Sequence, residues 1–147
     1  MGGSRIAIRI SSYAPDNMAI KLIECDKQKS YKLAEYMNDI IIIQGDGRNV
    51  DLLKEEGIRD MDAFIALTDS SETNILACLT AKELGVKKTI AEVENIQFIS
   101  TAERLNIGNI INKKLLAASR IFQLLLDEDS SNAKCLALSD AVVVELV

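Results

Sequence analysis

A carboxylate and a pair of glycines, roughly twenty residues apart, carry the clearest chemistry in this sequence. Glu24 directly follows the apolar run 19–23, and Gly2 and Gly3 stand at the start of the chain. An acid at the end of the second strand of a β-α-β unit accepts hydrogen bonds from both ribose hydroxyls of an adenine nucleotide, and it repels the 2′-phosphate of NADP. The spacing therefore predicts a site for NAD(H), with Glu24 on the adenine-side ribose.

Residues 2–7 (GGSRIA) form a loose version of the G-x-G-x-x-G/A phosphate loop. In such a loop, glycines let backbone N–H groups approach the pyrophosphate, and the following helix adds the positive end of its dipole. Ser4 replaces the middle glycine, which disfavours a close approach. Gly2 and Gly3 also fit an ordinary flexible chain start, so the motif gains its weight from the strand that ends before Glu24.

Composition narrows the classes of function. The 147 residues suffice for one domain with a real core, and the absence of histidine removes the commonest catalytic bases and metal ligands. A net charge of −5 argues against a nucleic-acid surface. No apolar run approaches the roughly 20 residues that cross a bilayer, and three scattered cysteines are typical of a reducing compartment. We predict a cytoplasmic, non-enzymatic protein without a metal site, nucleic-acid binding or direct membrane insertion.

Short apolar strands alternate with capped helices along most of the chain. Strands are expected at 19–23, 40–43, 63–67 and 89–93, with a weaker fifth at 109–112. Their near-continuous apolar character is typical of parallel strands covered on both faces. Helices are expected after four capping residues, and the longest is expected at 113–126; the caps are Asp26, Asn49, Asp69 (paired with Glu72) and Asn95. We predict an α/β, Rossmann-like parallel sheet with flanking helices.

The two ends of the chain depart from that pattern. No strand precedes the glycine turn, so the first strand of the fold is expected to be absent. Residues 5–13 fit a helix or an antiparallel strand, and we favour the helix because Ile6, Ile10 and Tyr13 share helical spacing. A polar linker at 127–134 is followed by two short apolar segments, 135–138 and 141–147, which predict a C-terminal β-hairpin.

Several segments in order resemble the RCK (or KTN) regulatory nucleotide-binding domains of potassium transport, most closely the TrkA group. They are GGSRIA (2–7), KLIECD (21–26), IQGDGRNVDLLKEEGI (43–58), ALTDSSETNILACLTAKELGVKK (66–88) and INKKLLAASRIF (111–122). The resemblance implies an RCK/TrkA-N-like nucleotide-binding domain at 1–126, a linker at 127–134 and the start of a TrkA-C-like domain at 135–147.

The resemblance also implies roles for individual positions. The implied site residues are Gly2, Ser4, Arg5 and Ile6 at the pyrophosphate, Glu24 with its neighbour Cys25 at the ribose, Asp46 at the adenine, and Thr68 and Asp69 at the second phosphate or the nicotinamide side. On local grounds, Asp46 also fits an ordinary Gly-Asp-Gly turn. Glu92 stands where relatives commonly carry a cation, and a carboxylate there is expected to repel phosphate.

The resemblance implies a regulatory subunit that senses NAD(H), or ATP or ADP. Its implied partner is a membrane potassium transporter subunit of the TrkH/TrkG kind. That partner would hold it at the inner face of the cell membrane as a homodimer or higher homo-oligomer. The alternative is a degenerate Rossmann-like interaction module that no longer binds nucleotide, which Ser4, Ala7, Glu92 and the missing first strand favour. A Rossmann-type oxidoreductase would need a proton-handling residue and a substrate domain, and neither is visible.

Overall fold

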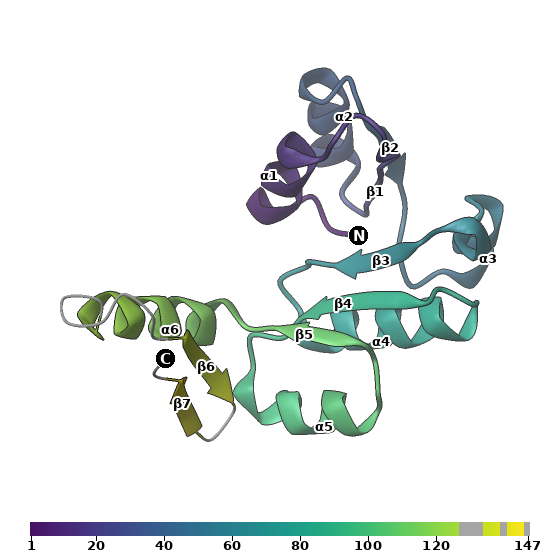
Figure 1. The fold of residues 1–147 in the computed structure, drawn as a ribbon. Coiled ribbons are helices and arrows are strands. Elements are labelled where there is room, and N and C mark those ends of the chain that lie inside the picture. Colours follow the sequence, from purple (N-terminus) through teal and green to yellow (C-terminus); the bar gives the residue numbers. More distant parts are fainter. Residues whose placement is uncertain (127–133, 139–140, 146–147) are drawn as a thin grey trace.

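The computed structural model describes residues 1–126, 134–138 and 141–145, and it confirms an α/β fold of parallel strands with flanking helices (Figure 1). The strands pair in two parallel groups: β1 (Lys21–Glu24) with β2 (Ile41–Gln44), and β3 (Ala63–Ala66) with β4 (Lys88–Glu92) and β5 (Asn109–Ile111). The connections contain α2 (Lys27–Tyr36), α3 (Val50–Glu55), η1 (Ile58–Asp60), α4 (Ser71–Glu83), η2 (Ile96–Phe98) and α5 (Ile99–Arg104).

Met1 and Gly2 join the two groups of strands. The Met1 amino group donates to Ile65 O over 2.7 Å, and Met1 O accepts from Leu67 N–H over 2.9 Å, which are the two bonds of a parallel ladder with β3. On the other side, Gly2 N–H donates to Ile23 O of β1 over 2.8 Å. The N-terminus accordingly lies between β1 and β3 in Figure 1.

The resulting strand order is β2-β1-β3-β4-β5, with the first two residues of the chain inserted between β1 and β3. This is the order of a Rossmann sheet whose central strand is reduced to its last two residues. Among the described residues, no strand element precedes α1, as expected. The chain then turns through Gly3 into α1 (Arg5–Tyr13), which confirms the helix favoured for these residues.

Three of the four predicted helix caps are confirmed, and one is wrong by a residue. Asp26, Asn49 and Asn95 each accept a backbone N–H of the following helix or helical turn. The cap of α4 is Ser70, whose Oγ accepts Thr73 N–H over 3.1 Å, and not Asp69. The backbone at Ser70 is extended and brings its hydroxyl over the first turn, a geometry that residue types alone do not distinguish between two adjacent capping residues.

The core lies between the sheet and the helices α3, α4 and α5. Its fully buried side chains include Leu53, Cys78, Val93 and Ile107. Burial raises the pKa of the Cys78 thiol to about 11, so this cysteine acts as a small apolar group.

The C-terminal part begins with the long helix α6 (Lys113–Leu126), as predicted. β6 (Lys134–Leu138) and β7 (Ala141–Glu145) pair antiparallel and confirm the hairpin. Lys134 belongs to β6 and not to the predicted linker, whose residues 127–133 lie outside the described residues, as do 146–147 of the second predicted strand. Within the described residues, no helix is long and apolar enough to cross a membrane.

The corrected cap of α4 gives a direct test. We expect Ser70→Ala to lower the free energy of unfolding by about 1 kcal/mol, because Thr73 N–H loses its acceptor. Asp69→Ala, one residue away and exposed, should leave it within about 0.5 kcal/mol. Urea denaturation of both variants measures the difference. A larger loss in the free energy of unfolding for Asp69→Ala would show that Asp69, and not Ser70, caps α4.

Candidate nucleotide site

The glycine turn lies at the carboxyl ends of β1 and β3, where open parallel sheets bind ligands. Gly2 has φ +89°, and a Cβ there would lie 2.9 Å from Leu67 O. A Cβ on Gly3 would lie 2.5 Å from Leu33 Cδ1 and 2.8 Å from Glu24 Oε2. Gly2 therefore requires glycine, whereas a side chain at Gly3 would have to displace the ends of the Leu33 and Glu24 side chains. The turn is packed against its neighbours and is not a loose chain start.

Ser4 closes the turn as the N-cap of α1. Its Oγ accepts Ala7 N–H over 3.3 Å, so the hydroxyl serves the helix. The N–H groups of Arg5 and Ile6 belong to the first helical turn, where no intrahelical acceptor exists. Such groups bind phosphate oxygens with the help of the helix dipole. The backbone at Arg5 and Ile6, more than the Ser4 hydroxyl, is thus suited to an anion.

Glu24 connects the end of β1 to the glycine turn. Its side chain is buried at 4% exposure, and Oε2 accepts Gly3 N–H over 2.8 Å. The same oxygen forms an ion pair with Lys29 Nζ at 3.0 Å, and Oε1 accepts Asp26 N–H over 2.9 Å. The carboxylate is therefore at the predicted place, but its oxygens already have protein partners.

These partners keep Glu24 ionised. Burial raises the pKa of its carboxyl, but the N–H groups of Asp26 and Gly3, together with Lys29, outweigh burial and lower the pKa from 4.5 to about 2. Lys29 is half exposed, so it is the partner that a ribose hydroxyl would displace most easily. The two backbone N–H groups fix the carboxylate in position.

The neighbouring predicted residues have local partners. Cys25 is exposed, and its thiol donates weakly to Glu24 Oε1 at 3.5 Å. Asp46 forms a two-point ion pair with Arg48, with Nη2 2.7 Å from Oδ2 and Nε 3.0 Å from Oδ1. The Asp46 carboxylate also accepts Arg48 N–H, which is the ordinary turn geometry. The Asp46 carboxylate is thus engaged by Arg48 within its own loop.

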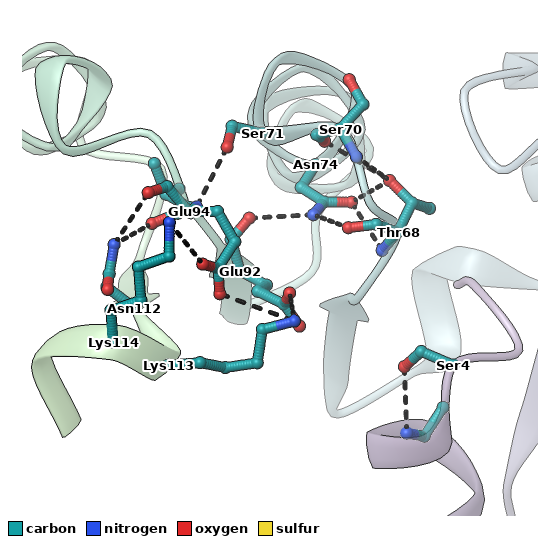
Figure 2. Close-up of polar contacts among 12 residues, drawn as sticks. Ser4, Thr68, Ser70, Ser71, Asn74, Glu92, Glu94, Asn112, Lys113 and Lys114 are labelled. Carbon is teal, nitrogen blue, oxygen red and sulfur yellow. Dashed lines mark hydrogen bonds and ion pairs between the residues drawn. The ribbon is translucent and has the colours of Figure 1, made fainter. Parts of the chain in front are cut away.

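Thr68 follows β3 and is held by Asn74, a fully buried residue of α4 that sequence reasoning missed (Figure 2). Asn74 Oδ1 accepts from Thr68 N–H and from its hydroxyl, over 3.0 and 2.6 Å. Its amide donates to Thr68 O and to Glu92 O, over 2.9 and 2.8 Å. Asn74 therefore ties the ends of β3 and β4 together, while Asp69 is exposed.

Glu92 ends β4 and forms an ion pair with Lys113, the first residue of α6 (Figure 2). The Glu92 side chain is 3% exposed, and its Oε1 lies 2.6 Å from Lys113 Nζ. The hydrogen bond to Glu92 raises the pKa of Lys113, which also lies 3.5 Å from Glu94. The expected repulsion of phosphate by Glu92 is thus offset by a cation from the next strand end.

Asn112 completes this edge of the site. Its amide donates to Val93 O and Glu94 O, and its Oδ1 accepts Leu115 N–H at the start of α6. Within the described part of the chain, no group of three or more cysteine or acidic side chains could hold a metal ion.

Comparison with known proteins identifies the family. Residues 1–113 match the TrkA-N domain. The chain belongs to the TrkA-N domain family. A Trk system potassium uptake protein TrkA homolog 1 from Methanosarcina mazei is 33% identical over 111 residues, which cover 76% of this chain and 27% of that protein. The TrkA of Vibrio alginolyticus is 30% identical over all 147 residues of this chain, which cover 32% of that protein. The chain thus spans about a third or less of the curated relatives it matches.

Solved structures support the same fold. The TrkA-N domain of the Escherichia coli inner membrane protein ybaL has a TM-score of 0.72 at 11% identity, covering 84% of this chain and 90% of that chain. The GsuK channel bound to NAD has a TM-score of 0.65 at 17% identity, covering 90% of this chain and 23% of that chain. At these identities, the likeness establishes the Rossmann-like architecture of this TrkA-N chain.

The low pKa of Glu24 predicts a loss of stability in acid. A carboxyl with a folded pKa of about 2 and an unfolded value of 4.5 stabilises the fold above pH 4.5, and this contribution disappears as the pH falls toward 2. We expect a loss on the order of 3 kcal/mol that Glu24→Gln lacks and that the exposed-site control Glu35→Gln retains. Urea denaturation between pH 5 and 2 measures it, and parallel curves for all three proteins would contradict the assignment.

The Glu92–Lys113 ion pair predicts that two adjacent lysines, Lys113 and Lys114, contribute differently to stability. Lys113→Met leaves a buried carboxylate without its cation, and we expect a loss of about 1 to 2 kcal/mol, since the lysine is 46% exposed. Lys114→Met removes a lysine that is 76% exposed and 4.0 Å from Glu94, and it should change stability by less than about 0.5 kcal/mol. If urea denaturation shows equal changes in the free energy of unfolding for the two substitutions, the structural role of Lys113 is contradicted.

Proposed function

We propose that this chain is the nucleotide-sensing part of a cytoplasmic regulatory subunit of a potassium uptake system, with NAD(H) as the favoured ligand. The observation that carries the proposal is the buried Glu24 carboxylate in contact with Gly3 N–H, beside the N-terminus of α1. An acid and a glycine turn in this relation suit the ribose and the pyrophosphate of one dinucleotide. No histidine is available as a proton-transfer group, which supports regulation over catalysis.

The residues of the site fit such a ligand. Gly2 leaves no room for a side chain between the turn and the backbone of Leu67, and backbone N–H groups at Arg5 and Ile6 are suited to phosphate oxygens. Glu24 would exchange Lys29 for ribose hydroxyls while the Gly3 and Asp26 N–H groups keep the carboxylate in place. When bound, the nucleotide supplies negative charge and hydrogen-bonding hydroxyls to the cleft.

Regulation requires a second state to which the nucleotide binds with a different affinity. We propose that this state is an arrangement of two or more copies of the chain, read by a TrkH/TrkG-like transporter subunit at the inner face of the membrane. Helix α6 supports the association of copies, because it exposes a group of large apolar side chains. They are Leu116, Ile121, Phe122, Leu124 and Leu125, with exposures from 40% to 72%. The NAD-bound GsuK channel and the Trk names of the relatives support the ligand and the transport system.

A second candidate function is an interaction module that has lost its nucleotide. It is favoured by the partners that already satisfy both Glu24 oxygens and by the Asp46–Arg48 pair, which leaves the adenine position without a free carboxylate. A third possibility is a sensor that binds ATP or ADP in place of NAD(H). These possibilities differ in what they bind, so direct titration separates them.

Thermal unfolding should be measured with NAD, NADH, ATP and ADP in separate titrations. A ligand that binds only the folded chain raises the melting temperature in proportion to the logarithm of its concentration. We expect this rise with NAD or NADH at lower concentration than with ATP or ADP. A rise in melting temperature with ATP or ADP alone would identify an adenine nucleotide, and not NAD(H), as the ligand. An unchanged melting temperature in all four titrations would contradict nucleotide sensing and favour the interaction module.

Glu24→Gln tests the ribose contact. We expect it to weaken NAD(H) binding by a few-fold to about tenfold, because a neutral amide gives up the charge-assisted hydrogen bonds. Glu35→Gln on the exposed face of α2 is the matched control and should leave affinity unchanged. Calorimetric titration at pH 7, on samples shown to be folded, gives both values, and an unchanged affinity for Glu24→Gln would count against the ribose role.

A further inference from the structure

Lys29 lies across the glycine turn, beside the carboxylate that is proposed to contact the adenine-side ribose. Its Nζ is 3.0 Å from Glu24 Oε2, the oxygen that also accepts Gly3 N–H. The stem of the lysine passes over the same turn, because a Cβ built on Gly3 would lie 3.4 Å from Lys29 Cε. The lysine side chain is 50% exposed, whereas Glu24 is buried. A half-exposed cation therefore stands next to a buried anion at the proposed ribose position.

The start of α2 holds Lys29 in this place. Asp26 caps the helix, and its Oδ1 accepts Lys29 N–H over 2.7 Å. The N–H of Asp26 in turn donates to Glu24 Oε1 over 2.9 Å. The helix cap and the carboxylate thus belong to one turn, and the lysine reaches back from the helix toward the end of β1. Because backbone contacts fix its origin, the ammonium group stays near the ribose position even when it leaves Glu24.

This arrangement changes how the site receives a 2′-phosphate. An acid at the end of the second strand binds the ribose 2′-hydroxyl of NAD, whereas a nearby cation accommodates the 2′-phosphate of NADP. Such a phosphate carries a charge of about −1.5 to −2 at pH 7, so an unpaired Glu24 would repel it. With Lys29 at 3.0 Å, the local charge of the pair is zero. The chain therefore carries the features of both kinds of site at one position.

The other ion pair at this edge leaves Lys29 as the cation that the site can give to a phosphate. Gly45 N–H bonds to Glu24 O over 2.9 Å, so the loop after β2 lies beside the end of β1. In this loop, Arg48 is engaged by Asp46 at two points. Glu24, by contrast, accepts two backbone N–H groups besides the lysine. The buried carboxylate therefore keeps hydrogen-bond donors when Lys29 moves away.

We propose that Lys29 is a specificity-determining residue that lets this site accept the 2′-phosphate of NADP(H) as well as the free hydroxyl of NAD(H). The inference rests on the proposed function, because it concerns the ribose position of the same cleft. With NAD, the ribose hydroxyls replace Lys29 on Glu24, and the ammonium group turns to solvent. With NADP, Lys29 pairs with the 2′-phosphate, while Glu24 keeps its backbone donors.

Calorimetric titration of the full chain with NAD and with NADP, at one pH and one ionic strength, tests this role. In the unsubstituted chain, we expect the two dissociation constants to lie within about tenfold of each other, since the ion pair has no net charge. Lys29→Met should weaken NADP binding by about tenfold or more, because the 2′-phosphate loses a charge-assisted contact and meets Glu24 alone. NAD binding should change by less than about threefold, since exposed ion pairs contribute little.

Two further variants serve as controls. Lys32→Met removes an equal charge from an exposed position of the same helix, and it should leave both affinities within about twofold because salt screens distant exposed charges. Lys29→Arg keeps a cation suited to phosphate, and it should retain NADP binding within about threefold. Thermal unfolding without ligand shows which variants are folded.

The outcomes separate this inference from the proposed function. If the unsubstituted chain binds NAD but binds NADP more than about tenfold more weakly, this inference is overturned and the NAD site stands. An equal loss of both affinities in Lys29→Met, or the same loss of NADP affinity in Lys32→Met, also overturns it. If the folded, unsubstituted chain binds neither dinucleotide, the proposed function is contradicted and this inference is overturned with it.

Discussion

The hydrogen bond from Gly3 N–H to Glu24 holds together the part of the molecule on which the proposed function depends. A buried carboxylate needs donors, and Glu24 obtains them from Gly3, Asp26 and Lys29. The same contact positions the glycine turn against the end of β1 and so directs the start of α1 toward the cleft. One interaction thereby fixes both the acid and the anion-binding backbone of the candidate site.

The rest of the sheet edge is built on the same principle of satisfied buried polar groups. Asn74 joins the ends of β3 and β4, and Asn112 joins the end of β4 to α6. The ion pair of Glu92 and Lys113 lies between these two amides (Figure 2). A continuous set of contacts therefore runs from the glycine turn, beside Thr68, to the first residue of the helix with the exposed apolar face. We propose that this set connects the proposed nucleotide site with the surface of α6 that is proposed to contact a neighbouring copy.

Local sequence signals predicted most of the fold, because apolar patterning and side-chain helix caps act between residues that are close in sequence. Apolar runs gave the strands, and side-chain caps gave the helix starts at Asp26 and Asn49. The error at Asp69 arose because Ser70 is an equally good cap by residue type, and the backbone conformation decides between them. The absent first strand was also predictable, but its replacement by a ladder through Met1 and Gly2 was not, since it depends on strands that meet only in the folded chain.

The site was less predictable, because its pairs are distant in sequence. The position of Glu24 after a strand was a sufficient signal, whereas the Glu92–Lys113 pair joins residues from two different strand ends. Asn74 left only a weak signal, a polar residue among apolar helix positions. The charge of Glu92 alone predicts repulsion of phosphate, whereas folding brings Lys113 to this carboxylate.

Backbone NMR with NAD tests the central claim most directly, since it reports where the ligand lies. We expect that amide signals of residues 3–6 and 24–26 shift together and saturably as NAD is added, while those of the hairpin stay unchanged. Shifts confined to other surfaces, or none at millimolar NAD, would contradict a nucleotide site built on Glu24 and the glycine turn.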